Sequence, residues 1–403
     1  MSGRVFSSWF SSPVLLLAAL AASCGGGSSS HVNSIVTTGS NVQAIVVNSG
    51  PAHNYANGVF TSIIVCVPSS SNCQTIDGVL VDTGSYGLRL LSSAGGGELN
   101  LPLPPQTGPH GNPMGECGDF VDAYTWGSVV TADVKISGEQ ASSLPVQEID
   151  PTFAAPPTDC QDFGVPEEDT LQSLGANGIL GIGPYLQDCG DACVQTGTGN
   201  PGLYYECASS TCQVAGESLS AQVQNPVGLF TTDNNGVVVE LPATSSPAPS
   251  VTGSLVFGIG TQSNNGLGSA SVFPLDSNGE FNTAYNGTSY HGFVDSGSNG
   301  LFFLDTAMTT LPVCTDNSGF YCPTTAANLS ATTSSGSTKA TVNFSIGDAD
   351  TLFSNQVDFV FPTLGGPNPG TFDWGLPFFF GRNVFTAIQS QQTPGGAGPY
   401  WAF

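Results

Sequence analysis

The stretch VLVDTGS at Val79–Ser85 recurs in the second half of the chain as GFVDSGS at Gly292–Ser298. Each copy joins an apolar run, typical of a buried strand, to an acid, a hydroxyl residue and a glycine, which favour a tight turn. Glycine lets the backbone turn without a Cβ clash, so the carboxylate can point away from the strand end. One copy alone would indicate only a hairpin turn. Two copies, carrying Asp82 and Asp295, are improbable as two independent turns and indicate a repeated motif.

The composition is that of an acidic protein built mainly from strands. The 403 residues include 5 Lys and Arg against 30 Asp and Glu, which gives a formal net charge of −25. Five bases cannot form a phosphate-binding stripe, so no nucleic-acid partner is expected. Hydrophobic residues make up 39% of the chain, enough to build a core. Runs such as 58–67 and 230–239 predict strands and hairpins, and no stretch of fifteen residues shows a helical period.

The first thirty residues resemble an export signal. The apolar run Val14–Ala22 has nine residues, too few for a membrane span of about 20, but suited to a signal-peptide core. The sequence LAASC ending at Cys24 resembles the lipobox of bacterial lipoproteins. We therefore predict a lipoprotein signal peptide over 1–23, lipidation at Cys24 and a flexible Gly/Ser tether over 24–45. The alternative is an ordinary secretory signal followed by a chance cysteine.

This resemblance implies an extracytoplasmic protein that is lipid-anchored to a bacterial membrane. Gly25, rather than Asp, follows the cysteine. In Gram-negative lipoproteins such a residue implies the outer membrane.

Cysteine usage agrees with export. Ten cysteines remain after Cys24, and an even number in an oxidising compartment predicts five disulfides. The expected pairs are Cys66–Cys73, Cys117–Cys160, Cys189–Cys212, Cys193–Cys207 and Cys314–Cys322. No metal site is expected, because the chain has no Cys-x-x-Cys pair and its four His lie far from the cysteine clusters.

The paired motifs resemble those of the pepsin-like aspartic peptidases. Two further segments match in order: GILGIG at Gly178–Gly183 and WGLPFFFGRNVF at Trp374–Phe385. The resemblance implies an all-β, bilobal, pepsin-like double β-barrel with pseudo-two-fold symmetry and a central cleft. A Pro- and Ser-rich joint at 242–250 places the lobes at 46–245 and 246–403. The chain would be a divergent bacterial lipoprotein member of that family.

Membership would make the chain an extracytoplasmic endopeptidase with no cofactor. Two adjacent carboxylates, Asp82 and Asp295, cannot both remain charged cheaply, so they would share one proton and activate a water. The resemblance assigns hydrogen bonds to the carboxylates and across the two loops to the residues that follow each Asp: Thr83, Gly84, Ser85, Ser296, Gly297 and Ser298. The expected partner is a polypeptide bound in an extended conformation, and the protein is expected to be a monomer.

A flap hairpin that bears a tyrosine covers the cleft in this family. Tyr124 is the candidate here, with Trp126 next; Tyr124 could equally be a packed aromatic of a surface hairpin. Arg89 stands where an apolar residue or Trp is common, and a guanidinium that pointed into the cleft would lower the pKa of the Asp pair. Two alternatives stay open. One is a pepsin-fold surface lipoprotein that binds or interacts without catalysis. The other is an unrelated β-sandwich lipoprotein, for example a glycan-binding one, with an accidental motif pair.

Overall fold

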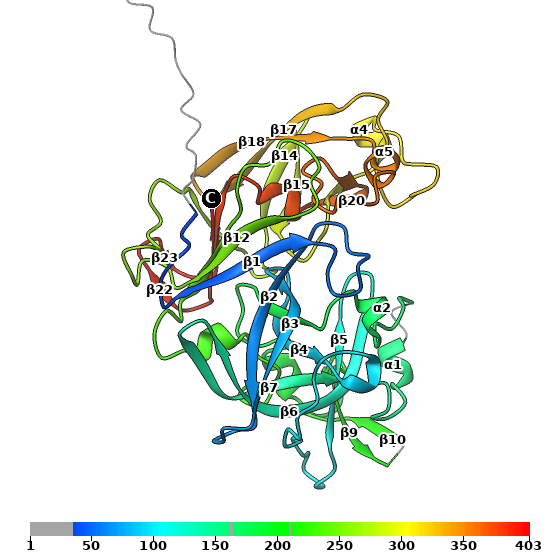
Figure 1. Ribbon diagram of the computed structural model, residues 1–403, viewed down its shortest axis with the longest axis vertical. Helices are drawn as coiled ribbons and strands as arrows, with labels where there is room; N and C mark the ends of the chain where they lie inside the picture. Colours follow the sequence, from blue (N-terminus) through cyan, green and yellow to red (C-terminus); the bar gives the residue numbers. More distant parts are fainter. Residues whose placement is uncertain (1–34, 162–163, 210) are drawn as a thin grey trace, which may run out of the picture. The chain divides into compact units, whose positions relative to one another are not determined.

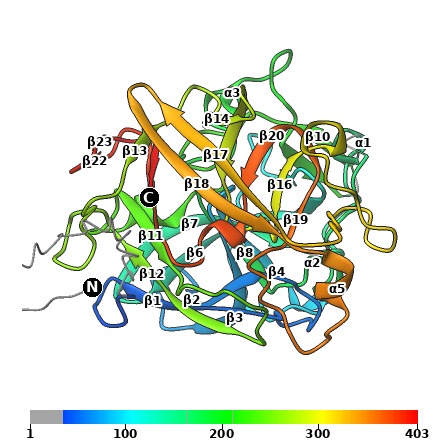
Figure 2. The same cartoon turned by 90° about the horizontal axis from the view of Figure 1, so that it is seen from above.

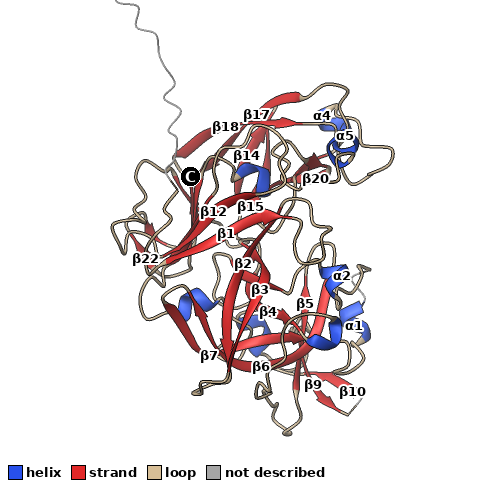
Figure 3. Ribbon diagram, in the orientation of Figure 1, coloured by secondary structure: helices blue, strands red, loops and turns tan. Residues whose placement is uncertain are grey.

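The computed structural model describes residues 35–161, 164–209 and 211–403. The predicted signal peptide, Cys24 and the first part of the predicted tether lie outside the described residues. Strands dominate, and the few helices are short (Figure 3). Within the described ranges, no helix is both long enough and apolar enough to cross a membrane.

Six strands of the first lobe form a closed barrel. Their order is β2-β3-β8-β4-β7-β6, and β6 pairs again with β2 to close the ring. The barrel strands are β2 (Gly58–Cys66), β3 (Cys73–Asp82), β4 (Tyr86–Leu91), β6 (Tyr124–Ile136), β7 (Glu139–Ile149) and β8 (Gly178–Ile182). Every residue of β8 is buried, so this strand runs through the centre of the lobe and supports the strands beside it.

Three strands extend this lobe beyond the barrel. They are β5 (Met114–Asp119), β9 (Tyr204–Ala208) and β10 (Thr211–Val214), in the order β10-β9-β5-β6. Because β5 and β6 pair in antiparallel register from Gly115 with Ser128 to Asp119 with Tyr124, they form a hairpin whose tip is residues 119–124. We call residues 119–124 the hairpin tip.

A set of six strands connects the barrel to the second lobe. In sheet order they are β1 (Val42–Asn48), β12 (Val251–Phe257), β11 (Gly236–Glu240), β21 (Asn383–Ala387), β24 (Tyr400–Ala402) and β13 (Val272–Pro274). β1 pairs with β2 on one side and with β12 on the other. The N-terminal strand therefore joins segments that lie about two hundred residues apart in the sequence (Figure 1).

The second lobe contains an open sheet of seven strands. In order they are β18 (Thr338–Ile346), β17 (Ala327–Ser335), β14 (Phe281–Tyr285), β15 (Thr288–Val294), β20 (Asn368–Trp374), β16 (Leu301–Leu304) and β19 (Gly365–Gly366). The long β17–β18 hairpin forms one edge and lies nearest the viewer in Figure 2. A separate two-stranded ribbon pairs β22 (Gln392–Thr393) with β23 (Gly396–Ala397).

The helices are single turns on the connections. They are α1 (Thr158–Gln161), α2 (Leu171–Leu174), α3 (Asp191–Val194), α4 (Thr306–Thr309), α5 (Ala349–Phe353) and the 3₁₀ turns η1 (Ser93–Gly95), η2 (Pro226–Leu229) and η3 (Leu376–Phe378). Hydroxyl, amide or carboxylate side chains cap several of them, for example Thr170 on α2 and Asp305 on α4. Such caps satisfy backbone N–H groups that a short helix leaves free.

The two lobes repeat one arrangement of three strands. In the first lobe, β3 runs parallel to β8, and β8 pairs antiparallel with β4. In the second, β15 runs parallel to β20, and β20 pairs antiparallel with β16. This repeat, together with the lack of long helices in the described ranges, confirms the predicted bilobal all-β fold.

Five disulfides staple the loops, and two of them differ from the prediction. Cys66–Cys73, Cys117–Cys160 and Cys314–Cys322 pair as expected. The nested pairs Cys189–Cys212 and Cys193–Cys207 are wrong: the structure has Cys189–Cys193 and Cys207–Cys212. Cys207 and Cys212 face each other across the β9–β10 hairpin, where neighbouring strands bring cysteines within bridging distance. Five disulfides are typical of proteins that fold outside the reducing cytoplasm.

Candidate active site

Both acids of the duplicated motif lie at the ends of buried parallel strands. Asp82 is the last residue of β3 and stands beside Gly181 of β8. Asp295 follows β15, and its backbone N–H donates to the Trp374 carbonyl of β20 at 3.2 Å. We call residues 82–85 the first Asp loop and residues 295–298 the second. Because the strands that carry these loops are held by neighbours on both sides, the loops are set on a rigid base.

Each loop holds its own carboxylate with the same two donors. The Gly84 N–H donates to Asp82 Oδ1 at 2.8 Å, and the Gly297 N–H donates to Asp295 Oδ1 at 2.7 Å. Ser298 Oγ donates to Asp295 Oδ2 at 2.8 Å. In the first loop, Ser85 Oγ donates to Asp82 Oδ2 in the equivalent position. These bonds orient both carboxylates before any ligand arrives.

The loops are tied to each other by reciprocal hydrogen bonds. The Thr83 N–H donates to Ser296 Oγ at 3.1 Å, and the Ser296 N–H donates to Thr83 Oγ1 at 3.0 Å. The same hydroxyls donate across to backbone carbonyls of the opposite strand: Thr83 Oγ1 to Val294 at 3.3 Å and Ser296 Oγ to Val81 at 2.7 Å. Both hydroxyl residues are fully buried, so this grip is shielded from water.

Close packing brings the two carboxyl groups together. A Cβ on Gly84 would lie 2.4 Å from Asp295 Cγ, and a Cβ on Gly297 would lie 2.7 Å from Asp82 Cγ. Only glycine fits at these positions, because the opposite carboxyl group occupies the space. Asp82 and Asp295 are within hydrogen-bonding distance of each other, and burial together with the Asp82 charge raises the pKa of Asp295 to about 8. The pair therefore holds one proton across a wide pH range.

The carboxyl pair opens into a cleft of about 1120 Å³. Both lobes contribute to its walls, and so does the hairpin tip through Asp119, Phe120, Val121 and Asp122. Val121 of the hairpin tip is 92% exposed. A cleft of this size can accept several residues of a peptide.

Tyr124 and Trp126 lie on the predicted hairpin, but neither lines the cleft. The Tyr124 hydroxyl donates to Glu167 Oε2 at 3.1 Å, and the Trp126 indole donates to the Ala154 carbonyl at 2.7 Å. Side chains two apart on a strand share a face, and this face packs on Tyr205 and the Cys117–Cys160 disulfide. The expectation that these aromatics cover the cleft is therefore wrong. The tyrosines that do line it are Tyr55 and Tyr86.

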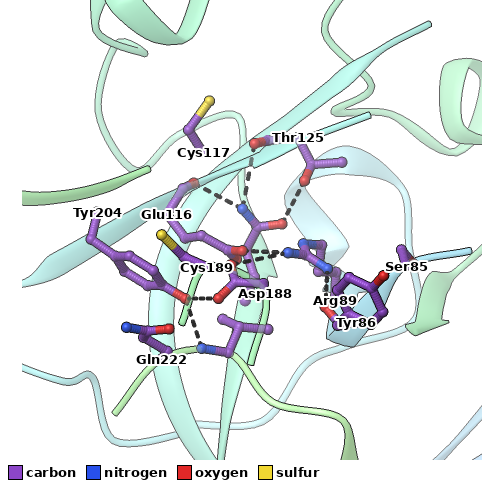
Figure 4. Close-up of polar contacts among 12 residues, drawn as sticks. Ser85, Tyr86, Arg89, Glu116, Cys117, Thr125, Asp188, Cys189, Tyr204 and Gln222 are labelled. Atoms are coloured by element: carbon purple, nitrogen blue, oxygen red, sulfur yellow. Dashed lines mark hydrogen bonds and ion pairs between the residues drawn. The ribbon is translucent and has the colours of Figure 1, made fainter. Parts of the chain in front are cut away.

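Arg89 does not direct its charge at the carboxyl pair. It is 4% exposed, and its Nη2 contacts Glu116 Oε1 at 2.5 Å and Asp188 Oδ2 at 3.4 Å (Figure 4). The Tyr204 hydroxyl donates to Asp188 Oδ1 at 2.6 Å. Burial raises the pKa of Glu116 despite the neighbouring guanidinium. This network ties β4, β5 and β9 together and so anchors the base of the hairpin.

The structure adds a third acid, Asp373, that the sequence did not single out. It lies on β20, is 6% exposed, and lines the cleft. Its Oδ1 has no hydrogen-bond partner among the described residues. Burial and the nearby Asp295 raise its pKa well above the usual range, although Ser298 opposes the shift. The signal in the sequence was an acid inside an apolar strand, Phe372-Asp373-Trp374, two residues before the glycine of the matched segment.

Two groups of side chains among the described residues have the spacing of metal ligands, and the first lies in the second lobe. Ligand atoms of Asp276, Glu280 and His291 are within 4.8 Å of one another. Asp276 and His291 are exposed, and His291 Nδ1 already contacts Glu280 at 3.0 Å. The second group consists of Cys314, Cys322 and Asp350. Its two sulfurs form a disulfide, and disulfide sulfurs are poor ligands because they carry no thiolate charge.

The fold and the two Asp loops define the class: a bilobal all-β protein with the pepsin-like architecture. The crystal structure of the aspartic proteinase from Irpex lacteus shares this fold, with a TM-score of 0.53 and 15% sequence identity over 90% of this chain and 96% of that one. Residues 37–403 match the family described as protein of unknown function DUF3443, and the chain belongs to that family. Comparison with curated proteins gives no match.

Proposed function

We propose that this protein is an extracytoplasmic aspartic endopeptidase. The observation that carries the proposal is the Asp82–Asp295 pair, two carboxyl groups in hydrogen-bonding distance at the base of a peptide-sized cleft, with the pKa of Asp295 raised by burial and by the Asp82 charge. Paired carboxyls with separated pKa values supply one base and one acid at the same pH. The likeness to a solved aspartic proteinase supports the fold on which this geometry depends.

The mechanism needs a single water between the two carboxyl groups. The charged member of the pair takes a proton from this water, while the protonated member donates its proton to the carbonyl oxygen of the peptide. Attack of the water on the carbonyl carbon gives a tetrahedral diol without a covalent bond to the protein. The proton taken from the water then passes to the leaving nitrogen. As the C–N bond breaks, a diol hydroxyl gives its proton to the other carboxylate, and the pair returns to its starting protonation state.

The surrounding groups limit the movement of the pair during these steps. The two glycine N–H groups hold the Oδ1 atoms of the carboxylates, and Ser85 and Ser298 hold the Oδ2 atoms. The Thr83–Ser296 grip keeps the loops at a fixed separation. Such pre-organisation lowers the cost of reaching the transition state. The substrate is an unfolded polypeptide bound as an extended strand, with the hairpin tip over it.

We further propose that Cys24 is lipidated and anchors the domain to a bacterial membrane. The five disulfides support an extracytoplasmic location. Labelling of expressing cells with a palmitate analogue tests the anchor: the full chain should incorporate the label, and Cys24→Ser should not. Label that persists in Cys24→Ser would contradict it.

The activity is tested by cleavage of an unfolded protein between pH 3 and 7, with and without pepstatin. The wild-type protein should cleave and be inhibited. Asp82→Asn and Asp295→Asn should each lose at least about 10³-fold in rate, because each removes one partner of the acid–base pair. Asp316→Asn, an exposed acid outside the cleft, is the matched control. If the folded Asp82→Asn and Asp295→Asn proteins both still cleave at the wild-type rate, the mechanism is refuted.

A second function, that of a peptide-binding surface protein without catalysis, is favoured by one observation. The tyrosine expected on the flap is turned away from the cleft and bound to Glu167. If folded wild-type protein binds peptides in the cleft but cleaves none at any pH tested, this second function replaces the first.

A further inference from the structure

We propose that the second-lobe wall of the cleft is a pocket for a cationic side chain, so that the preferred ligands are peptides with a Lys or Arg at one position. The pocket consists of Asp373, Phe293 and Phe302, and all three residues line the cleft. The inference rests on the proposed function and deepens it by naming its substrate class. Binding can be measured whether or not hydrolysis occurs.

The three residues stand side by side on adjacent strands. Asp373 of β20 is in register with Phe293 of β15 on one side and with Phe302 of β16 on the other. Residues in register on neighbouring strands point to the same face of the sheet, a few ångströms apart. A cation against the Asp373 carboxylate would therefore lie between two aromatic rings, and ring faces attract cations.

The unpartnered oxygen indicates that a ligand group completes this pocket. Asp373 is more than nine-tenths buried, and its Oδ1 accepts no hydrogen bond from any described residue. A buried carboxyl oxygen without a hydrogen-bond partner is costly, and a charged donor from a ligand would remove that cost. The groups that face it are Asp295, Asp82, Asp122 and Ser298. None of them is a cation, so no described residue that faces Asp373 supplies the positive charge that a bound Lys or Arg would bring.

The charge of the cleft favours the same ligand. Among the described residues that line it, eight are acids and one, Arg89, is a base. That single base is already paired with Glu116 and Asp188. The net field of the cleft is therefore negative, which raises the local concentration of cationic peptides.

The first lobe provides an internal control. Its residue in register with Leu80 and Arg89 is Ile179, which occupies the strand position equivalent to Asp373. Ile179 also lines the cleft. One wall should therefore accept an apolar side chain and the other a basic one, a difference that a peptide scan can detect.

The experiment measures binding to the Asp82→Asn protein, so that cleavage does not interfere. Fluorescent octapeptides carry Lys, in turn, at each position of a neutral sequence with a central Leu, and a parallel set carries norleucine there. Anisotropy titration should show one position at which Lys binds roughly 10- to 100-fold more tightly than norleucine, as expected for a charge-assisted bond.

Variants at Asp373 separate the pocket from general attraction. In the Asp82→Asn protein, a further Asp373→Asn substitution should remove the preference for Lys over norleucine at that position. Asp373→Ile should reverse the preference, so that norleucine binds more tightly. The control Asp316→Asn should leave the preference for Lys unchanged. A preference that survives Asp373→Asn, or an equal gain from Lys at every position, would overturn the proposal. Because isoleucine already occupies the equivalent position, Ile179, in the first lobe, Asp373→Ile keeps the test available if Asp373→Asn does not fold.

Failure of this inference is distinct from failure of the proposed function. If peptide binding depends on Asp373 but the wild type hydrolyses no peptide, the proposed pocket is supported and the proposed peptidase activity is refuted. Hydrolysis with no basic preference would do the opposite.

Discussion

The two lobes present the same three-strand row to the cleft, but with opposite placement of charge. In the first lobe the row reads Leu80, Ile179 and Arg89, and the charge lies on the outer strand. In the second it reads Phe293, Asp373 and Phe302, and the charge lies on the central strand. The Asp loops above these rows are matched bond for bond.

The difference lies in how each charge is compensated. Arg89 is neutralised inside the protein by Glu116 and Asp188. Asp373 has an oxygen with no partner among the described residues. The two Asp loops are therefore alike in their hydrogen bonds, while the cleft walls beside them differ in how their charge is compensated.

The largest effect is expected on the first-lobe charge. Arg89→Met leaves Glu116 and Asp188 buried together without a cation, which should lower the free energy of unfolding by about 3 to 5 kcal/mol. Denaturant unfolding at pH 7 measures this loss.

The matched control lies in the second lobe. Phe302→Leu, at the position equivalent to Arg89, should cost only about 1 kcal/mol. Adding Glu116→Gln to Arg89→Met should restore part of the stability. A loss below about 1 kcal/mol for Arg89→Met would mean that the network is not the anchor described here.

A smaller effect is expected at the glycines between the carboxyl groups. Gly84→Ala and Gly297→Ala force a methyl group against the opposite carboxyl and should each cost about 1 to 3 kcal/mol. Gly84→Ala should cost more, because its Cβ would lie at 2.4 Å from Asp295 Cγ, against 2.7 Å for the Gly297 Cβ and Asp82 Cγ. Thermal unfolding measures both.

Gly266 provides the control for this pair. It is exposed, its φ is not positive, and a Cβ added there would meet no atom within 4 Å. Gly266→Ala should therefore be neutral or slightly stabilising. Equal stability of all three alanine variants would show that the carboxyl groups are not packed as described.

The smallest effect is expected at the reciprocal hydrogen bonds between Thr83 and Ser296, to which both lobes contribute in the same way. Thr83→Val and Ser296→Ala each remove one hydroxyl that bridges the loops, and each should cost about 1 kcal/mol. The double variant should lose less than the sum of the two, since the hydroxyls share one network. Unfolding in denaturant measures the cycle. Strict additivity, or a several-fold difference between the two single variants, would contradict a symmetric grip.

The sequence could predict the parts of the fold that are locally encoded. An apolar strand followed by Asp, a hydroxyl residue and Gly specifies its own turn, so both Asp loops could be identified without a template. Cys66–Cys73 and Cys314–Cys322 followed in the same way from short spacing.

Features that depend on contacts between distant segments could not be predicted. The pairs Cys189–Cys193 and Cys207–Cys212 are not of this kind: their cysteines lie four and five residues apart, so short spacing alone would have predicted them, and the nested pairing was the wrong choice. Tyr124 is on the expected strand, but its face is set by packing against the Cys117–Cys160 region. The position of Asp373 beside the cleft required the register of β20 against β15.

The most direct test of the central claim is the titration of the carboxyl pair. Carboxyl-carbon NMR of protein labelled at aspartate, with the signal assigned by its loss in Asp295→Asn, reports the pKa of Asp295. We expect a pKa near 8 in the wild type and a lower one in Asp82→Asn, where the neighbouring charge is gone. A wild-type value close to that of an ordinary exposed aspartate, unchanged by Asp82→Asn, would show that the two carboxyl groups do not share a proton.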